Sequence, residues 1–219
     1  MVHLAGVSVR RDRRRVLKDV ELITGEGDVV AIMGRNGSGK TTLLRTVFGF
    51  EPPERGTVET AGMDMSRHQP VELGKRAAYL PQRSGSMLFN ESVRAELEFT
   101  RRNRSATSDD EWLIELLDIG ALLDRDPRDL SEGERLRAAL AASLIGAPAV
   151  VLLDEPTRGM DGGQKALLQR LVIELRARGT CVLLATHDTE LASRVATRVV
   201  LLGEGEIVAD GPPHEVLAG

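Results

Sequence analysis

Residues 34–41 of this chain read Gly34-Arg35-Asn36-Gly37-Ser38-Gly39-Lys40-Thr41. They follow an apolar run at 29–33 and precede Thr42 and a helix-forming segment, so the pattern G-x-x-x-x-G-K-[ST] stands in its strand, loop and helix setting. Residues without a Cβ let backbone N–H groups turn toward phosphate oxygens, and the helix N-terminus adds positive potential. We therefore predict that residues 34–42 bind a nucleoside triphosphate. A chance glycine-rich loop is excluded by the match in both pattern and setting.

Two side chains of this loop have predicted roles at the phosphates. In loops of this kind the lysine bridges the β- and γ-phosphates as a point charge, which assigns that role to Lys40. The hydroxyl of Thr41 is expected to hold a Mg²⁺ ion that neutralises the same oxygens. Mg²⁺, bound together with the nucleotide, is therefore the predicted cofactor.

A second chemical stretch joins an apolar run at 149–153 to two carboxylates, Asp154 and Glu155. A continuous apolar run is typical of a parallel strand covered on both faces, and open α/β sheets bind ligands at the carboxyl ends of such strands. Asp154 is expected to bind Mg²⁺ directly or through water, and Glu155 to polarise a water molecule toward the γ-phosphate. The alternative, a strand that acids merely cap, is disfavoured by the phosphate loop upstream.

A third apolar run, at 181–185, ends in Thr186, His187 and Asp188. A histidine at this strand end can donate a hydrogen bond near the γ-phosphate and so sense whether that phosphate is present. Alone, His187 would be an ordinary polar strand terminus, and its position relative to the other motifs changes that interpretation. The remaining histidines, His3, His68 and His214, are expected at the surface.

The order of predicted elements indicates an α/β fold with a mostly parallel sheet. Before the middle of the chain, the sequence pattern predicts short strands at 2–9, 16–22 and 77–80 and a short strand pair at 56–62. The first two are expected to be antiparallel. The pattern then becomes helical, with helices expected at 91–102, 111–119 and 130–145. The predicted domains are a nucleotide-binding core at 1–84 and 146–219 and an inserted helical subdomain at 85–145.

Length, net charge, cysteine content and the length of the apolar runs exclude some classes of protein. The chain has 219 residues, enough to bury a full core, and its formal net charge of -4 gives no global attraction to nucleic acid or anionic membrane. The single cysteine, Cys181, lies in an apolar run, so we expect a buried thiol and a reducing cytoplasm. No run approaches the ~18 apolar residues that span a bilayer. We therefore expect a protein that is neither secreted nor integral to a membrane.

These motifs together resemble those of the ATP-binding cassette (ABC) ATPases, and the resemblance covers the whole chain. Gln82 falls at the Q-loop glutamine, Leu130-Ser131-Glu132-Gly133-Glu134 at the LSGGQ signature, Gly159-Met160-Asp161 at the D-loop, and His187 at the switch histidine. The resemblance implies a RecA-like P-loop NTPase core with an N-terminal antiparallel β region. It also implies ATP hydrolysis in which Gln82 and His187 act beside Glu155, with Gln82 contacting the metal as well.

The resemblance further implies that two such subunits, identical or related, face each other head to tail. Ser131 and Gly133 of one signature, which also contains Glu134, would then contact the γ-phosphate held by Lys40 of the other subunit. The sequence departs from the family at Glu132, in place of the first signature glycine, and at Glu134, in place of glutamine. Two extra carboxylates near a triphosphate repel it unless they face away.

One segment of the chain resembles a particular subfamily of the ABC ATPases. Residues 88–97, Leu88-Phe89-Asn90-Glu91-Ser92-Val93-Arg94-Ala95-Glu96-Leu97, are similar to the energy-coupling-factor (ECF) importer ATPases. In such transporters this region meets the coupling helices of a transmembrane subunit, while a separate small membrane protein binds a vitamin or metal ion. The chain lacks the acidic residues that members often have at 83–86. The resemblance implies a peripheral protein at the cytoplasmic face of the cell membrane.

The N-terminal hairpin departs from the ABC pattern. Family members usually stack an aromatic side chain from this hairpin on adenine, whereas residues 7–12 contain none and residues 10–15 contain five arginines. Arg11, or else Arg10, is therefore a candidate to stack its planar guanidinium on the base. The alternative is that the arginines form a solvated hairpin tip, as charge runs usually do.

Three functions remain open from the sequence. The first is the ATPase subunit of an importer, and the second is that of an exporter or another transporter class. The third is a soluble cassette protein acting on ribosomes or DNA, but such proteins usually carry two cassettes or a long coiled coil, and no specific nucleic acid is expected here. A P-loop kinase would not need residues 130–134. The transported substrate would be selected by another chain.

Overall fold

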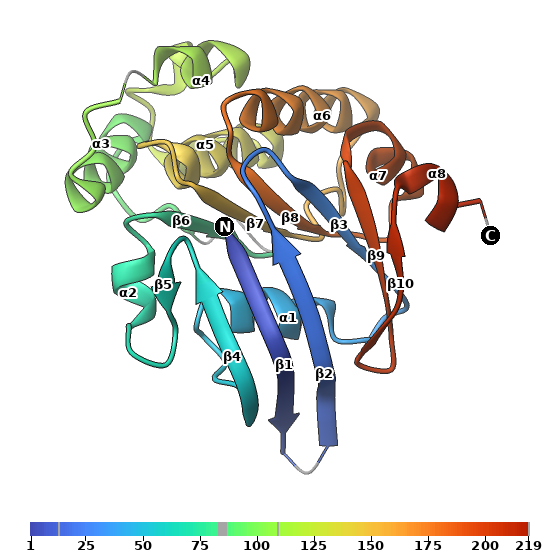
Figure 1. The fold of residues 1–219 in the computed structure, drawn as a ribbon. Helices are drawn as coiled ribbons and strands as arrows, with labels where there is room; N and C mark the ends of the chain where they lie inside the picture. Colours follow the sequence, from blue (N-terminus) through green and yellow to red (C-terminus); the bar gives the residue numbers. More distant parts are fainter. Residues whose placement is uncertain (13, 83–86, 109, 219) are drawn as a thin grey trace.

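The computed structural model describes residues 1–12, 14–82, 87–108 and 110–218 of the chain. Arg13 of the arginine run, the 83–86 stretch and the predicted domain boundary between residues 84 and 85 lie outside the described residues. Figure 1 shows a central sheet with most of the helices above it and a second, smaller sheet below. Among the described residues, no helix has the length and apolar character needed to cross a membrane.

The central sheet has six strands in the order β10-β9-β3-β8-β7-β6. All neighbouring pairs are parallel except β9 and β10. The strands are β3 (Val29–Met33), β6 (Ala77–Leu80), β7 (Val150–Asp154), β8 (Cys181–Ala185), β9 (Arg198–Gly203) and β10 (Glu206–Gly211). The predicted mostly parallel sheet is confirmed, and its three apolar runs are the neighbouring strands β3, β8 and β7.

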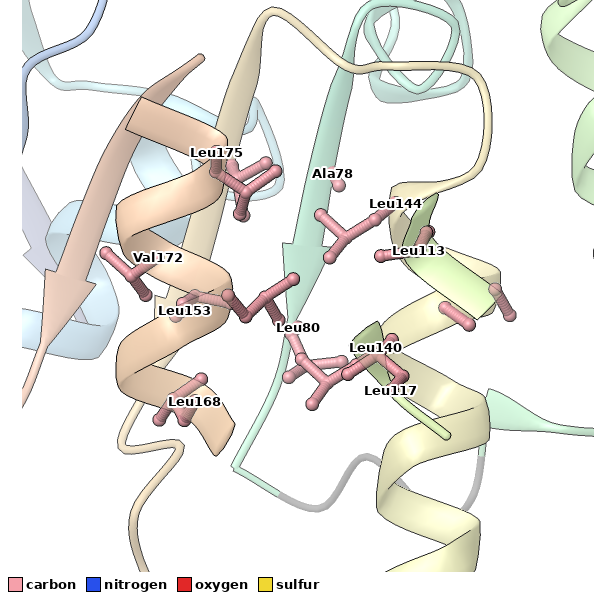
Figure 2. Packing of buried hydrophobic residues seen from close by; sticks show 14 of the residues in the cluster. Ala78, Leu80, Leu113, Leu117, Leu140, Leu144, Leu153, Leu168, Val172 and Leu175 are labelled. Atoms are coloured by element: carbon pink, nitrogen blue, oxygen red, sulfur yellow. The ribbon is translucent and has the colours of Figure 1, made fainter. Parts of the chain in front are cut away.

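Side chains alternate along these strands between two separate cores. On β7, Val151 and Leu153 join a cluster built mainly with the helices, whereas Val150 and Leu152 join a cluster on the opposite face. Figure 2 shows Leu153 and Leu80 between leucines of α5 (Glu132–Leu144) and α6 (Gly162–Ala177). Because both faces of the sheet are covered, the inner strands β3 and β8 are apolar at every position, as the sequence pattern predicts.

The smaller sheet is antiparallel, with the order β2-β1-β4-β5. Its strands are β1 (Val2–Arg11), β2 (Arg14–Thr24), β4 (Arg55–Thr60) and β5 (Met63–Asp64). The hairpin of β1 and β2 confirms the predicted pair of N-terminal strands, and Arg11 pairs in register with Arg14 near its tip. Arg10 and Arg15 both pair with Glu54, at 3.2 and 3.7 Å. The arginine run is therefore partly an ion-paired surface.

The remaining helices are α1 (Lys40–Val47), α2 (Pro70–Leu73), α3 (Val93–Arg104), α4 (Glu111–Leu116), α7 (Thr189–Val195) and α8 (Pro213–Val216). Two short 3₁₀ turns, Gly120–Leu122 and Pro127–Asp129, join α4 to α5. Arg104 at the end of α3 donates to backbone carbonyls of Gly74, Ala77, Ser143 and Ile145. Burial lowers the pKa of Arg104 to about 10. One guanidinium thus ties α3 to β6 and to the end of α5.

Cys181, at the start of β8, is fully buried. Its Sγ lies 3.1 Å from Oγ1 of Thr24, and burial raises the pKa of the thiol to about 11. Because only a thiolate is strongly nucleophilic, this thiol is unreactive. The predicted buried core cysteine is confirmed.

Candidate nucleotide-binding site

The phosphate loop occupies residues 34–39, between the end of β3 and the first turn of α1. Gly34 has a φ of 147°, and a Cβ there would lie 2.2 Å from the carbonyl oxygen of Leu202 on β9. Gly39 has a φ of 112°, and a Cβ there would lie 2.9 Å from Cδ2 of Leu17 on β2. Both positions need glycine because the loop is pressed against two strands while its backbone takes left-handed dihedrals.

The loop presents donors that fit phosphate oxygens. Gly39 caps α1 without a side-chain hydrogen bond, so the first N–H groups of the helix are left for a ligand. Ser38 Oγ is buried and has no hydrogen-bond partner among the described residues. Lys40 Nζ donates to the carbonyl oxygens of Gly34 and Arg35, at 2.8 and 3.2 Å, which holds the ammonium group over the loop.

A cleft of about 500 Å³ opens beside this loop. Of the predicted site residues, those that line it are Asn36, Gly37, Gly39, Lys40, Thr41, Thr42, Gln82, Glu155 and His187. Val16 and Arg158, which are not among the predicted site residues, line it as well. Arg11 is exposed at the hairpin and is not among the lining residues, so its predicted stacking on the base remains a prediction.

Asp154 ends β7 with both carboxylate oxygens hydrogen-bonded. Thr41 Oγ1 donates to Oδ1 at 3.0 Å, and the Tyr79 hydroxyl donates to Oδ2 at 3.2 Å. Burial raises the pKa of Asp154, although the two hydrogen bonds act in the opposite direction. Burial, and then the negative charge of Asp154, raise the pKa of Tyr79 well above its usual value, so the phenol keeps its proton and donates.

The residues around Asp154 fit a Mg²⁺ ion. Thr41 and Asp154 offer hydroxyl and carboxylate oxygens 3.0 Å apart, and Gln82 lines the same cleft. The part of the chain that the structure describes contains no group of three or more His, Cys, Asp or Glu that could hold a metal by itself. That donor set suits Mg²⁺, which uses one or two carboxylates and takes its other ligands from phosphates and water. It would not make a closed zinc site.

Glu155 contacts two other residues of the cleft, His187 and Lys40. Its Oε2 is 2.7 Å from Nδ1 of His187, and its Oε1 is 3.7 Å from Nζ of Lys40. The carboxylate side chain is 12% exposed, whereas that of His187 is 66% exposed and free to meet a ligand. Glu155 has a φ of 49°, a left-handed backbone conformation that costs energy for a residue with a Cβ.

The signature residues lie at the start of α5. Ser131 caps the helix and forms a capping box with Glu134, and its hydroxyl also donates to Oε2 of Glu134 at 2.7 Å. Glu134 Oε1 also pairs with Arg125 at 3.1 Å. Hydrogen bonds from Ser131, and then the charge of Arg125, lower the pKa of Glu134. The carboxylate of Glu134 is thus used within its own subunit, whereas Glu132 is exposed.

The signature and the D-loop share a second cleft of about 550 Å³. Ser131, Gly133, Glu134 and Asp161 all line it. A Cβ at Gly133 would lie 2.5 Å from Nε2 of Gln164, whose side chain forms a capping box with Asp161 at the start of α6. These residues do not line the cleft of the phosphate loop. The structure therefore forms two separate clusters from the predicted site residues.

Two partners of the predicted carboxylates were not predicted from the sequence, namely the hydroxyl of Tyr79 for Asp154 and the guanidinium of Arg125 for Glu134. A usable signal existed for Tyr79, because it lies in a short apolar strand beside the one that ends in Asp154, and a buried tyrosine hydroxyl needs a partner. Arg125 gives no comparable signal, since it is one of several arginines in a charged segment.

Comparison with known proteins agrees with this geometry. A sequence model of the ABC transporter family matches residues 17–158. The chain therefore belongs to the ABC transporter family.

Individual relatives cover the whole chain. It is 44% identical over 213 residues to a putative ABC transporter ATP-binding protein of Streptomyces coelicolor, covering 96% of this chain and 38% of that protein. It is 36% identical over 220 residues to the hemin import ATP-binding protein HmuV of Rhodococcus jostii, covering 97% of this chain and 75% of that protein. The chain thus spans less than half the length of the Streptomyces relative.

Two solved structures have the same fold. One is cbiO1 from Clostridium perfringens, described as part of the ABC transporter complex cbiONQ, with a TM-score of 0.86 and 28% identity over 99% of this chain and 90% of that one. The other is an ATP-binding cassette in a dimeric, post-hydrolysis state bound to ADP and Pi. Its TM-score is 0.84, with 25% identity over 97% of this chain and 99% of that one.

Proposed function

We propose that this chain binds and hydrolyses ATP with Mg²⁺ and that this reaction powers a membrane transporter. The observation that carries the proposal is the meeting of Lys40, Glu155 and His187 at one cleft beside a phosphate loop, with Asp154 hydrogen-bonded to Thr41 of the same cleft. Lys40 and the loop N–H groups bind the phosphates, and Thr41 and Asp154 would hold the ion, which would neutralise phosphate charge. Glu155 accepts a proton from the attacking water, and His187 Nδ1–H orients its carboxylate.

An apolar groove supports the assignment to a transporter. It has a volume of about 470 Å³ and lies between the core and the helices, with Phe50, Phe89 and Phe99 among its lining residues. Phe50, Phe89 and Phe99 are 45%, 67% and 37% exposed. Large exposed aromatic side chains gathered in a groove are typical of a surface that a partner covers. We infer that a helix of a transmembrane transporter subunit docks here, which would place the chain at the cytoplasmic face of the membrane.

Hydrogen bonds to Glu96 hold the backbone at Phe89, one of the residues that line the groove. The buried carboxylate of Glu96 accepts hydrogen bonds from the backbone N–H groups of Phe89 and Asn90, both at 3.0 Å, and from the Asn90 side chain. Phe89 and Phe99 pack edge to face with ring centroids 5.2 Å apart. An exposed aromatic held this firmly loses little conformational freedom when a partner binds.

We further propose an importer, of the ECF type, that carries a vitamin or a metal ion. The similarity of residues 88–97 to ECF importer ATPases supports this, as do relatives whose names concern hemin import and the cbiONQ complex. The ATPase of an exporter is the second candidate, because its chemistry and groove would be the same. A soluble cassette protein acting on ribosomes or DNA is disfavoured by the family match and by the exposed groove.

The partner proposal predicts that Phe89→Ser weakens capture of a polytopic membrane protein from solubilised membranes. An aromatic anchor of this kind contributes about 2 kcal/mol or more to binding, so capture should fall more than tenfold. The measurement is quantitative mass spectrometry of proteins retained by the tagged chain. Val208→Ser, at a 60% exposed position that does not line the groove, is the matched control and should capture normally. Equal capture by both variants, or recovery of ribosomal proteins alone, would reject the proposal.

The role of Arg11 gives another prediction. Arg10 and Arg15 share Glu54, so Arg11 is the hairpin arginine proposed to reach the base. Arg11→Ala should then weaken ATP and GTP binding alike, by about two- to fivefold, because stacking contributes roughly 0.5–1 kcal/mol. Stacking makes no contact with the edge of the base, so it does not distinguish adenine from guanine. Arg11→Tyr should restore both affinities. The affinities are measured by calorimetry. If they are unchanged in both variants, the stacking role of Arg11 is rejected, Val16 becomes the candidate hairpin residue at the base, and the arginines form a solvated tip.

A further inference from the structure

Tyr79 takes part in both the apolar groove and the candidate metal site at Asp154. It lies on β6, and it is among the residues that line the apolar groove. Its hydroxyl donates to Oδ2 of Asp154, the carboxylate proposed to hold Mg²⁺. Tyr79 therefore connects the groove with the metal-binding end of β7 through a single side chain.

The hydroxyl of Tyr79 constrains the orientation of Asp154. Thr41 donates to one carboxylate oxygen and Tyr79 to the other, so rotation of the carboxylate breaks at least one hydrogen bond. Asp154 is 3% exposed, so water cannot easily replace a lost donor. Residues that hydrogen-bond a metal ligand fix its orientation, and their loss usually weakens metal binding.

The ring of Tyr79 is itself held by aromatic neighbours. Its centroid lies 5.9 Å from that of Phe48 and 5.6 Å from that of Phe50, and the two phenylalanine rings lie 4.7 Å apart. Phe48 follows the last residue of α1, the helix that begins with Lys40 and Thr41. The Tyr79 ring thus packs against the end of α1, and α1 also carries Thr41, the other donor to Asp154.

We propose that Tyr79 is a positioning residue for Asp154, and that Phe48 and Phe50 hold its ring so that the packing of the groove affects Mg²⁺ binding. This inference rests on the proposed role of Asp154 as a metal ligand. It assigns Tyr79 no contact with nucleotide. Its effect is confined to the orientation of one carboxylate, which separates it from a residue that merely stabilises the fold.

The test uses Tyr79→Phe, which keeps the ring and removes the hydroxyl. Affinity for a fluorescent ATP analogue is measured over a range of Mg²⁺ concentrations and in EDTA. The variant should need roughly tenfold more Mg²⁺ for half-maximal enhancement of binding. Its affinity in EDTA should be unchanged, because the phosphate loop is intact. An unshifted Mg²⁺ dependence, or equal weakening with and without Mg²⁺, would overturn the proposal.

Asp154→Asn separates failure of this inference from failure of the proposed function. If Asp154→Asn abolishes the Mg²⁺ enhancement while Tyr79→Phe leaves it unshifted, Asp154 is the ligand and only the role of Tyr79 is wrong. If Asp154→Asn leaves the Mg²⁺ enhancement unchanged, the proposed metal role of Asp154 fails, and the role of Tyr79 fails with it.

The contribution of the ring is tested by a double-mutant cycle with Phe50→Ala. If Phe50 acts by holding Tyr79, its removal should shift the Mg²⁺ dependence in the wild-type background and add nothing in the Tyr79→Phe background. Ile173→Ala, at a 52% exposed apolar position on α6, controls for loss of surface apolar area and should cause no shift. Equal shifts from Phe50→Ala in both backgrounds would show that Phe50 acts independently of the hydroxyl and would reject the link to the groove.

Discussion

Glu155→Gln is expected to lower ATP turnover by roughly 100- to 10,000-fold while ATP remains bound. The amide keeps the size and shape of the side chain but cannot accept a proton from the attacking water. The contacts of Glu155 place it for this role, since its two oxygens face His187 and Lys40, at 2.7 and 3.7 Å. The loss should appear in kcat, because the proton transfer belongs to the transition state.

The measurement is steady-state phosphate release together with the nucleotide content of the isolated protein. Lys40→Ala is the informative comparison, because it removes a charge from the phosphates and should weaken ATP binding itself. A hydrogen bond to a charged group contributes about 2 kcal/mol, which corresponds to a loss of roughly thirtyfold in affinity. Near-normal turnover by Glu155→Gln would show that another group is the base, and unchanged binding by Lys40→Ala would contradict the proposed phosphate site.

Ser131→Arg is expected to abolish ATP hydrolysis without affecting ATP binding to a single subunit. The phosphate loop and the signature line different clefts of the chain, so a site that needs both must be completed by a second subunit. A large cation at position 131 would block the approach of the partner's triphosphate. In dilute solution, the specific activity of the wild-type chain should rise with protein concentration, because assembly limits hydrolysis.

Mixing two impaired variants gives the sharper test. In a head-to-tail pair of Lys40→Ala with Ser131→Arg, one site combines the intact phosphate loop of one subunit with the intact signature of the other. At an ATP concentration that fills the wild-type site but not the Lys40→Ala site, the mixture should therefore recover part of the wild-type activity, whereas each variant alone hydrolyses little ATP. Activity that does not depend on concentration, from a chain shown to be monomeric by light scattering, would reject the shared site. A related partner chain in place of a second copy would appear as activity only after that chain is added.

The contacts around Ser131 also affect how strongly the signature repels a triphosphate. Its hydroxyl is engaged by Glu134, and Arg125 balances the charge of that carboxylate. The repulsion expected from an extra acid in the signature is therefore reduced at Glu134, but not at the exposed Glu132. The two departures from the family signature are not equivalent, which the sequence alone did not reveal.

Much of the fold follows from local sequence. The loop at 34–41, the apolar runs that became β3, β7 and β8, and the serine that caps α5 each depend on residues a few positions apart. Such signals can be read without knowing the fold, because backbone dihedrals, capping and burial on both faces act over short stretches. The strand order depends on pairing between distant segments, and the apolar runs say nothing about which neighbour each will take.

The sequence by itself determined the chemistry of the candidate site, namely a phosphate loop, a carboxylate pair and a histidine at the ends of apolar strands. Only the tertiary structure decided the partners of those groups. Tyr79 lies 75 positions from Asp154, and Val16 reaches the phosphate loop from a different sheet. Contacts of this kind arise when strands distant in the sequence become neighbours, and side-chain orientation then depends on packing that no short stretch encodes.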